Sequence, residues 1–410
     1  MTTREPELGA EVPLKFHHPT VKGRGAQLSP QVRFEAFSRE EIDDGWSQPD
    51  ESVPGEEAGR AAGSADPPLP KTSVTAQIAK SIISRNQSPD LPFNQSVNPY
   101  YGCEHGCAYC YARPSYAYWG LSPGLDFETK IFAKPNAAAL LRAELARPGY
   151  VCETLAIGTN TDAYQPAERE WKITRALLEV CAEFNQPVGL ITKSSLIERD
   201  IDILAPMAAR GLVKAYISVP TMDPETARTL EPRAAAPYRR IETMRALVAA
   251  GIPVGVMTAP VIPMVNDAGM EAALEAARDA GATEAAYVLL RLSHELKDIF
   301  RDWLARHMPL RAAHVMSVVQ QMRGGADNDS RFGVRMKGEG IFAELIAQRF
   351  EKACARLGLN QRNYHYALDT TRFHVPAGSA PEPRRSAKSG SSGTPASSAE
   401  GEPGPQMRLF

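Results

Sequence analysis

Residues 98–113 read NPYYGCEHGCAYCYAR and hold three of the six cysteines of this 410-residue chain. Cys103, Cys107 and Cys110 follow the pattern C-x3-C-x2-C. They come directly after a strand expected at residues 96–100, so the thiols are predicted on a loop at the carboxyl end of that strand. Soft thiolate ligands select iron–sulfur clusters, zinc or copper(I), and the loop is therefore a candidate metal site.

Three thiolates suit a four-iron cluster that keeps one iron open, where a small molecule can be chelated. Gly102 and Gly106 allow the tight turns and close backbone approach that such a loop needs. A zinc site with His105 or a distant cysteine as the fourth ligand is the alternative. Zinc sites usually add a second ligand pair about 12 or more residues away, and no such pair follows. The other cysteines stand singly on apolar faces, as buried packing thiols do: Cys152, Cys181 and Cys354.

The composition, 43% hydrophobic and 23% charged, is typical of a globular protein. No stretch approaches the run of about 20 apolar residues that a membrane span requires. Residues 1–7 are polar and acidic, unlike a secretory signal, so we expect a cytoplasmic protein. Residues 35–57 carry nine acids against one base, a charge of −8 within a net −2, which leaves +6 for the rest. A modestly basic body is compatible with nucleic acid, although many basic surfaces bind nothing.

Beyond residue 95, short strand-like runs alternate with amphipathic helices. Strands are expected at 96–100, 154–158, 187–192, 213–219, 253–259 and 285–290. Helices are expected at 136–145, 167–184, 196–207, 238–250, 270–280 and 294–307. Six β-then-α units in series predict an α/β fold with a parallel sheet and right-handed crossovers. An open doubly wound sheet and a partial TIM-type barrel both fit, and in either the ligands gather at the carboxyl ends of the strands.

Four regions are predicted along the chain. Residues 1–75 form a mostly disordered acidic extension, except that 21–26, with Phe34 and Phe37, could dock on the body as an extended arm. Residues 76–310 form the core. Residues 311–375 form a helical extension packed on the core, with a helix at 340–357. Residues 376–410 form a disordered tail rich in Pro, Ser and Gly.

The three-cysteine loop, with an aromatic residue before its last cysteine, resembles that of the radical S-adenosylmethionine (AdoMet) superfamily. Over about residues 80–310 the chain is similar to the spore photoproduct lyase-like (DNA repair photolyase-like) group. It is closer still to an uncharacterised bacterial branch with the motifs N-P-Y-x-G-C-E-H-G-C, G-L-D-F-E-T-K and T-D-x-Y-Q-P-x-E.

The resemblance implies a partial (β/α)6 barrel with a 4Fe–4S cluster on Cys103, Cys107 and Cys110. AdoMet would chelate the open iron, and reduction of the cluster would cleave AdoMet to a 5′-deoxyadenosyl radical that abstracts hydrogen from the substrate. An electron donor of flavodoxin or ferredoxin type is implied as well. Tyr109 matches the aromatic residue whose backbone lies near the adenine.

Further AdoMet contacts are expected at the ends of the next strands. Thr161 and Asp162 belong to an unusually polar run that follows the second strand and replaces, by position, the superfamily's glycine-rich amine-binding motif. Asp162 as a simple helix cap is the alternative. Lys193 and Ser218 end the third and fourth strands, where a cation and a hydroxyl can reach the AdoMet carboxylate or ribose. For Lys193, ordinary solvent exposure is the alternative.

Other polar residues are expected around the same rim. Arg233, Arg239 and Arg240 follow the fourth strand, and they either bind a phosphate or carboxylate or form a solvated helix start. Arg291 and His294 follow the sixth strand, near the substrate entrance. Five more are rim candidates without a separate role: Glu104, His105, Asp126, Glu128 and Lys130.

The leading hypothesis is a radical SAM enzyme, lyase-like, that acts on nucleic acid in DNA repair or processing. Radical modification of a peptide, tRNA or small metabolite is the second reading, and a non-enzymatic metal-cluster binding protein is the third. In spore photoproduct lyase a cysteine is thought to return hydrogen to the product. Asn160 stands nearest that position here, which argues against spore photoproduct repair itself.

The chain ends in QMRLF, residues 406–410, which resembles the Q-L-x-L-F peptide that docks on the DNA polymerase sliding clamp. Leu409 and Phe410 would fill an apolar pocket while Gln406 makes an oriented hydrogen bond. A linker of about 30 residues gives a reach of roughly 30 Å, which is adequate for a tether. An arbitrary tail that ends in two hydrophobic residues is the alternative.

We expect deletion of Leu409 and Phe410 to abolish binding to the sliding clamp, because both apolar anchors are removed. A pull-down of purified clamp by full-length and truncated protein measures this directly. Undiminished capture by the truncated chain would show that the tail is not a clamp-binding peptide.

Overall fold

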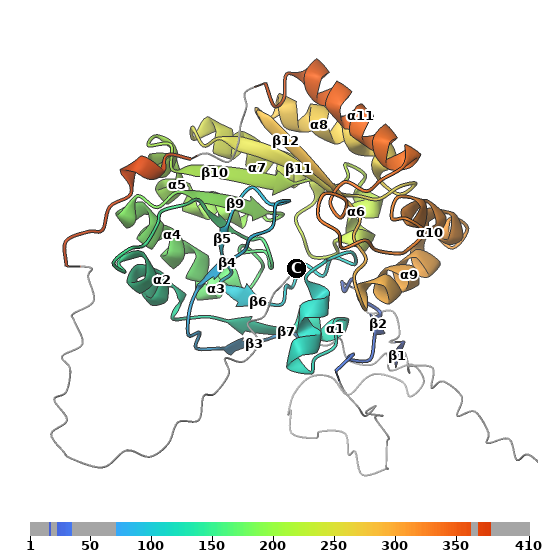
Figure 1. Ribbon diagram of the computed structural model, residues 1–410, viewed down its shortest axis with the longest axis horizontal. Coiled ribbons are helices and arrows are strands. Elements are labelled where there is room, and N and C mark those ends of the chain that lie inside the picture. The colour runs from blue at the N-terminus through green and yellow to red at the C-terminus, as the bar shows by residue number, and fades with distance from the viewer. Residues whose placement is uncertain (1–15, 18–22, 35–70, 362–367, 379–410) are drawn as a thin grey trace, which may run out of the picture.

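The computed structural model describes residues 16–17, 23–34, 71–361 and 368–378. A seven-stranded sheet forms the body of the protein. Its strand order is β12-β11-β10-β9-β8-β5-β4 (Figure 1). All neighbours pair in parallel except β4, which is antiparallel to β5. The bounds are β12 Glu284–Leu289, β11 Val254–Val261, β10 Val213–Ser218, β9 Val188–Thr192, β8 Leu155–Ile157, β5 Gln95–Val97 and β4 Ile83–Arg85.

The strand order distinguishes between the two architectures left open by the sequence. From β5 to β12 each strand lies beside the strand that precedes it in this series, with no reversal of direction across the sheet. A doubly wound sheet reverses at a switch point, so this order instead belongs to a partial (β/α)6 barrel. The expected fold class is confirmed, and each of the six expected strands is present within a few residues of its predicted bounds.

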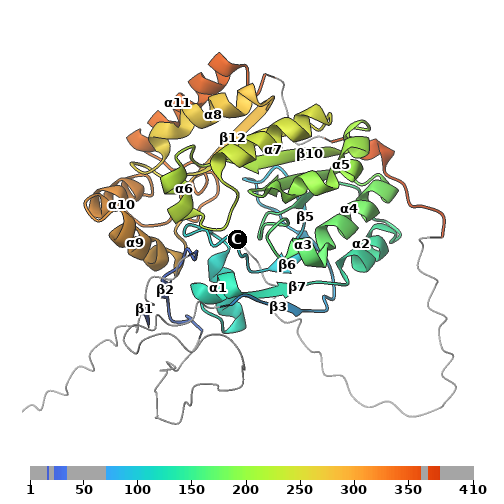
Figure 2. The same ribbon diagram turned by 180° about the vertical axis from the view of Figure 1, so that it is seen from behind.

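The helices that cover the outer side of this sheet bury one apolar face each (Figures 1 and 2). They are α2 Ala137–Leu145, α4 Ile173–Phe184, α5 Ile201–Ala208, α7 Pro237–Ala249 and α8 Met270–Asp279. The helix expected at 167–184 is interrupted: α3 (Glu168–Trp171) ends at Lys172, whose φ is 51°. The Glu168 carboxylate then accepts hydrogen bonds from the first amides of α4, which explains why the helix restarts there.

Several elements lie outside the predicted pattern. A three-stranded sheet joins β3 (Ser73–Ala76), β7 (Lys130–Ala133) and β6 (Tyr100–Tyr101), and the short α1 (Leu125–Thr129) precedes β7. The helix expected at 294–307 is present as α9 Leu296–His307, and the remaining helices are α6 Pro224–Leu230, α10 Ala312–Gln321 and α11 Ile341–Leu357. The last of these matches the helix expected at 340–357 and packs against α8.

Residues 23–34 dock on the body beside the cysteine loop. The amides of Gly25 and Ala26 donate to the buried carboxylate of Glu128, over 3.0 and 2.8 Å. Further along, Arg33 pairs with Glu295 at 2.8 Å. The docking expected of residues 21–26 is thus confirmed for residues 23–26, whereas Phe37 lies outside the described residues.

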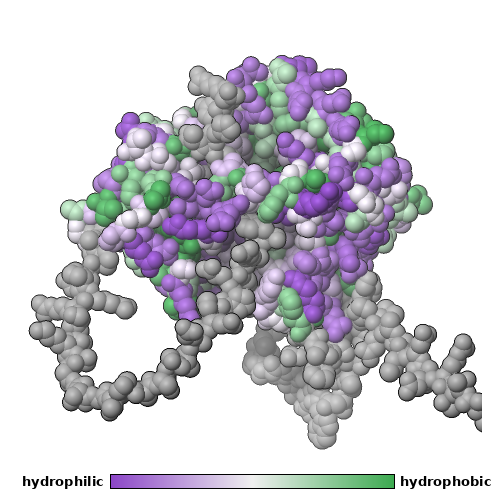
Figure 3. Space-filling view, in the orientation of Figure 1, coloured by the Kyte–Doolittle hydropathy of each residue, from purple (hydrophilic) through white to green (hydrophobic). Residues whose placement is uncertain are grey.

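Polar and apolar residues are interspersed over the face shown in Figure 3. Within the described ranges, no helix is both long enough and apolar enough to cross a membrane.

We expect Gly25→Ala to displace the docked arm, because a β-carbon at residue 25 would lie 1.6 Å from the carbonyl oxygen of Gly106. Such overpacking costs about 1–3 kcal/mol, so the variant should melt at a lower temperature than the parent protein. Gly269→Ala is the matched control, since its β-carbon would meet open space. Equal melting temperatures for the two variants would show that the arm does not pack as described.

Candidate active site

The cysteine loop follows β6 and turns through a series of short backbone contacts. The amide of Cys110 donates to the carbonyl of Cys107 over 3.2 Å, and that of Gly106 donates to Cys103 over 3.4 Å. Gly102 and Gly106 have φ of 76° and 67°, in the left-handed region that favours glycine. A β-carbon at Gly106 would also lie 2.7 Å from Glu128 Oε2. The predicted reason for glycine at these two positions is confirmed.

The three thiols of the loop are free to act as metal ligands. Cys103 and Cys107 are buried, Cys110 is partly exposed, and none forms a disulfide. Among the described residues, no three His, Cys, Asp or Glu side chains converge as one zinc ion would require. A four-iron cube binds each thiolate to a different iron, so its ligands need not converge on one point. Burial raises the pKa of Cys103, and the nearby Asp162 and the other two thiols raise it further.

A buried ion pair between Arg113 and Glu128 holds the cysteine loop in place. The guanidinium of Arg113 is fully buried and donates through Nε to the carbonyl of Cys107 over 2.8 Å. It also donates to the carbonyls of Pro123 and Gly124, and its Nη2 lies 2.5 Å from Glu128 Oε1. Glu128, a rim candidate from the sequence, is therefore a positioning residue that joins the loop to the docked arm.

The motif T-D-A-Y-Q-P-A-E, residues 161–168, holds the base of the cysteine loop. The hydroxyl of Thr161 donates to the carbonyl of Tyr100 over 3.1 Å. The amide side chain of Gln165 donates to the carbonyl of Gly102 and accepts from the backbone amide of Glu104, over 3.1 and 3.0 Å. The sequence marked this motif as polar but assigned it to the ligand, and it missed Gln165 as a positioning residue.

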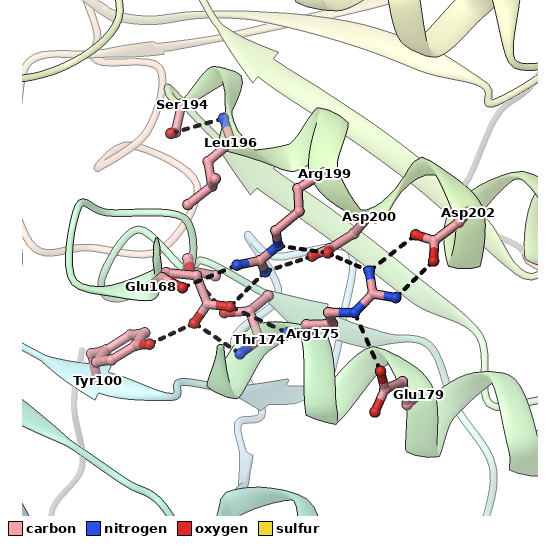
Figure 4. Close-up of polar contacts among 11 residues, drawn as sticks. Tyr100, Glu168, Thr174, Arg175, Glu179, Ser194, Leu196, Arg199, Asp200 and Asp202 are labelled. Carbon is pink, nitrogen blue, oxygen red and sulfur yellow. Dashed lines mark hydrogen bonds and ion pairs between the residues drawn. The ribbon is translucent and has the colours of Figure 1, made fainter. Parts of the chain in front are cut away.

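Glu168 is the centre of a buried polar network at the same place (Figure 4). Its carboxylate accepts from the hydroxyl of Tyr100 and from the amide of Thr174, over 2.5 and 3.0 Å. The guanidinium of Arg199 donates to it over 2.7 Å and also pairs with Asp200. The network thereby joins the start of the cysteine loop to α4 and to the 3-10 turn before α5.

Asp162 ties the ends of two neighbouring strands together. Its Oδ1 accepts from the amide of Tyr164 and the hydroxyl of Thr192, over 2.9 and 2.7 Å. Its Oδ2 accepts from the amide of Lys193 over 2.8 Å and lies 3.4 Å from Nδ1 of His105. Burial acts to raise the pKa of Asp162, but His105 and these hydrogen bonds hold it below its usual range. A carboxylate has about four acceptor sites, so most of those on Asp162 are committed to the chain.

Lys193 points its charge into the space beside the cysteine loop. Its ammonium lies 5.8 Å from the ring centre of Tyr109. Burial acts to lower the pKa of Lys193, but the negative charges of Cys107, Glu231 and Asp162 raise it above its usual value. Within the described part of the chain the ammonium forms no hydrogen bond or ion pair. It is therefore a cation available to a ligand.

Tyr109 and Ser218 lie on either side of a second buried ion pair. The hydroxyl of Tyr109 donates to Glu231, whose other oxygen lies 2.5 Å from Arg240. Arg240 also donates to the carbonyl of Ser218 over 2.9 Å. The four residues form one connected wall, in which Ser218 is a largely buried residue whose hydroxyl has no hydrogen-bond partner among the described residues.

The arginines that follow the fourth strand form ion pairs with carboxylates of the chain itself. Arg240 is buried against Glu231, as above, and Arg239 pairs with Glu198 through two contacts of 2.7 Å. Arg233 pairs with Glu104 over 3.2 Å. The alternative of a solvated helix start is wrong for Arg240, because its guanidinium is buried.

Comparison with known proteins gives consistent matches to one family. The family model described as "Radical SAM superfamily" matches residues 97–277. An uncharacterized protein of Mycobacterium tuberculosis is 37% identical over 235 residues, which are 57% of this chain and 69% of that protein. A point variant of spore photoproduct lyase has a similar fold, with a TM-score of 0.52 at 12% identity over 70% of this chain and 80% of that one. Spore photoproduct lyase complexed with dinucleoside spore photoproduct gives a TM-score of 0.50 at 12% identity, with the same coverage of the two chains.

We expect Glu168→Gln to destabilise the fold by about 3 kcal/mol or more, because it removes one charge from a buried ion pair. Denaturant unfolding of the purified protein measures the loss. Glu183→Gln is the matched control: Glu183 pairs with Arg142 on the exposed surface, where such pairs contribute about 1 kcal/mol or less. Comparable losses for the two variants would contradict the central position assigned to Glu168.

Proposed function

The chain belongs to the radical SAM superfamily. We propose that it is an enzyme whose substrate is nucleic acid and that it acts in DNA repair or processing. The observation that carries the enzymatic assignment is the three-thiol loop at the mouth of a partial barrel in a chain of this family. The third reading of the sequence, a non-enzymatic binding protein, is thereby set aside.

The superfamily's cofactors are a 4Fe–4S cluster and AdoMet, and when bound they supply a 5′-deoxyadenosyl radical that abstracts hydrogen from the substrate. Cys103, Cys107 and Cys110 would hold the cluster and leave one iron for AdoMet. Their loop is positioned by Arg113 and Gln165, so the site is organised before any ligand binds.

The chain's own polar groups would orient AdoMet. Lys193 is the natural partner of the AdoMet carboxylate, since it is a cation without an anion among the described residues. The hydroxyl of Ser218 would bind the ribose or carboxylate. Tyr109 would offer its backbone to the adenine, because its hydroxyl already donates to Glu231. Thr161 and Asp162 would act on AdoMet mainly by holding the loop and Lys193 in place.

Two features support nucleic acid as the substrate class. The fold is similar to that of spore photoproduct lyase, which has been solved with a dinucleoside. Tyr111 follows the last cysteine and is 51% exposed, so a ring face is offered to a base at the mouth of the site. Spore photoproduct repair itself is not part of the proposal, since Asn160 occupies the position nearest that of the hydrogen-returning cysteine.

Two partners belong to the same proposal. A flavodoxin or ferredoxin would deliver the electron that reduces the cluster. Residues 406–410, which lie outside the described residues, would tether the enzyme to the DNA polymerase sliding clamp.

We expect anaerobically reconstituted protein to bind about four irons per chain and to release 5′-deoxyadenosine from AdoMet under a strong reductant. Cys107→Ala should lose both properties, because it removes one of three cluster ligands. Cys152→Ala removes a thiol far from the loop in sequence and should keep both. Unchanged iron content and turnover in Cys107→Ala would refute the assignment.

Whether nucleic acid is the substrate is measured separately from the radical chemistry. Single-stranded or damaged DNA should bind the reconstituted enzyme and raise 5′-deoxyadenosine formation above the level without substrate. Stimulation by peptides or tRNA and not by DNA would favour the second reading of the sequence.

A further inference from the structure

Three arginines gather where the C-terminal extension meets the mouth of the barrel. Arg291 follows β12, Arg323 follows α10, and Arg335 lies in the loop before α11. Burial lowers the pKa of Arg291, and the positive charge of Arg335 lowers it further. Burial likewise lowers the pKa of Arg323, to about 10, with Arg291 as the next cause. Arg291 therefore lies within electrostatic range of each of the other two arginines.

Arg335 and Arg323 form different kinds of contact with the rest of the chain. Arg335 lies 2.6 Å from Asp90 and donates to the hydroxyl of Ser88. In the described part of the chain, Arg323 donates to backbone carbonyls, among them that of Leu290 over 2.8 Å. Its Nε is buried without a hydrogen-bond partner, and no carboxylate of the described residues pairs with it. The charge of Arg323 is thus fixed in place but not neutralised by contact.

Arg291 is the member of this group with unused donors. Its guanidinium lies 5.8 Å from the ring centre of Tyr111, and within the described residues the hydrogen bond of Nη1 is to the sulfur of Met336, at 3.8 Å. Its Nε is buried without a partner, and no carboxylate within the described ranges pairs with it. The segment that carries Met336 is tied to β12, because the amide of Leu289 donates to the Met336 carbonyl over 2.9 Å. The position of Arg291 is therefore set by the fold, whereas its buried Nε–H donor has no acceptor among the described residues.

This arrangement is costly unless an anion completes it. A buried donor without an acceptor costs about 1–3 kcal/mol, and a buried charge without a partner costs more. Arg291 leaves such a charge beside Tyr111, the half-exposed residue that follows the last cysteine, and Arg323 adds a second charge within electrostatic range of Arg291. The planar guanidinium matches the oxygens of a phosphate group, and Tyr111 offers a ring to a base next to it.

From this geometry we propose that Arg291 binds a backbone phosphate of the nucleic acid substrate at the mouth of the barrel, with Arg323 behind it. The inference rests on the proposed function, since it takes the substrate to be nucleic acid. It also gives the C-terminal extension a role, because Arg323 and Met336 come from that extension. Arg291 is then a substrate-binding residue, and Lys193, near Cys107, remains the cation for AdoMet.

The test is oligonucleotide binding by the anaerobically reconstituted full-length protein, measured by fluorescence anisotropy at several salt concentrations. Arg291→Gln should weaken binding of single-stranded DNA about tenfold and reduce the slope of log affinity against log salt by about 0.7, the value for one phosphate contact. Arg291→Lys keeps the charge without the planar fork and should lose less affinity. Arg142→Gln removes an arginine from a surface pair elsewhere and should change neither quantity.

The possible results separate this inference from the function on which it rests. If the parent protein binds no oligonucleotide, the proposed function fails. If the parent binds and Arg291→Gln binds with the same affinity and salt slope, only the role of Arg291 is overturned. If Arg291→Gln weakens AdoMet binding and leaves DNA binding intact, the anion is the AdoMet carboxylate and the inference is again overturned. Melting temperatures of both Arg291 variants verify that each is folded.

Discussion

The buried ion pair between Arg113 and Glu128 is the contact on which the cysteine loop depends. The loop contains no helix or extended strand of its own, so its backbone groups need partners from elsewhere. Arg113 supplies donors to three carbonyls, that of Cys107 among them, and Glu128 neutralises its charge. Because Glu128 also binds the amides of Gly25 and Ala26, the same pair attaches the N-terminal arm. One buried pair thus organises the cysteine loop and the N-terminal arm, which lie far apart in the sequence.

The second support comes from the motif at residues 161–168, on the neighbouring strand end. Thr161 and Gln165 bind backbone groups of residues 100–104, and Glu168 binds the hydroxyl of Tyr100. A loop held on both sides needs little reorganisation when a cluster and AdoMet bind, and such preorganisation lowers the cost of binding. The polar run after the second strand therefore serves the ligand largely through the loop that it holds.

The charges around the site divide into those that the chain has neutralised and those that it has left for a ligand. Arg113, Arg239 and Arg240 each pair with a carboxylate of the chain. Lys193 and Arg291 have no such partner in the described structure. The ammonium of Lys193 lies 5.8 Å from the ring centre of Tyr109, and the guanidinium of Arg291 lies 5.8 Å from the ring centre of Tyr111. This division fits two different anionic ligands, a cofactor carboxylate and a substrate phosphate.

The sequence by itself determined the cysteine spacing, the two glycines that permit the loop and the six strands, because each of these is a local pattern. It also placed Lys193 and Ser218 at strand ends, since the carboxyl ends of parallel strands share one edge of a sheet. Strand order was decided only by the tertiary structure, because pairing between strands joins residues that are far apart in the chain. The same holds for the partners of Glu168, Arg240 and Arg291. A sequence does not show whether a polar side chain binds another part of the chain or a ligand. The groups that pack against the side chain in the tertiary structure determine which of the two it binds.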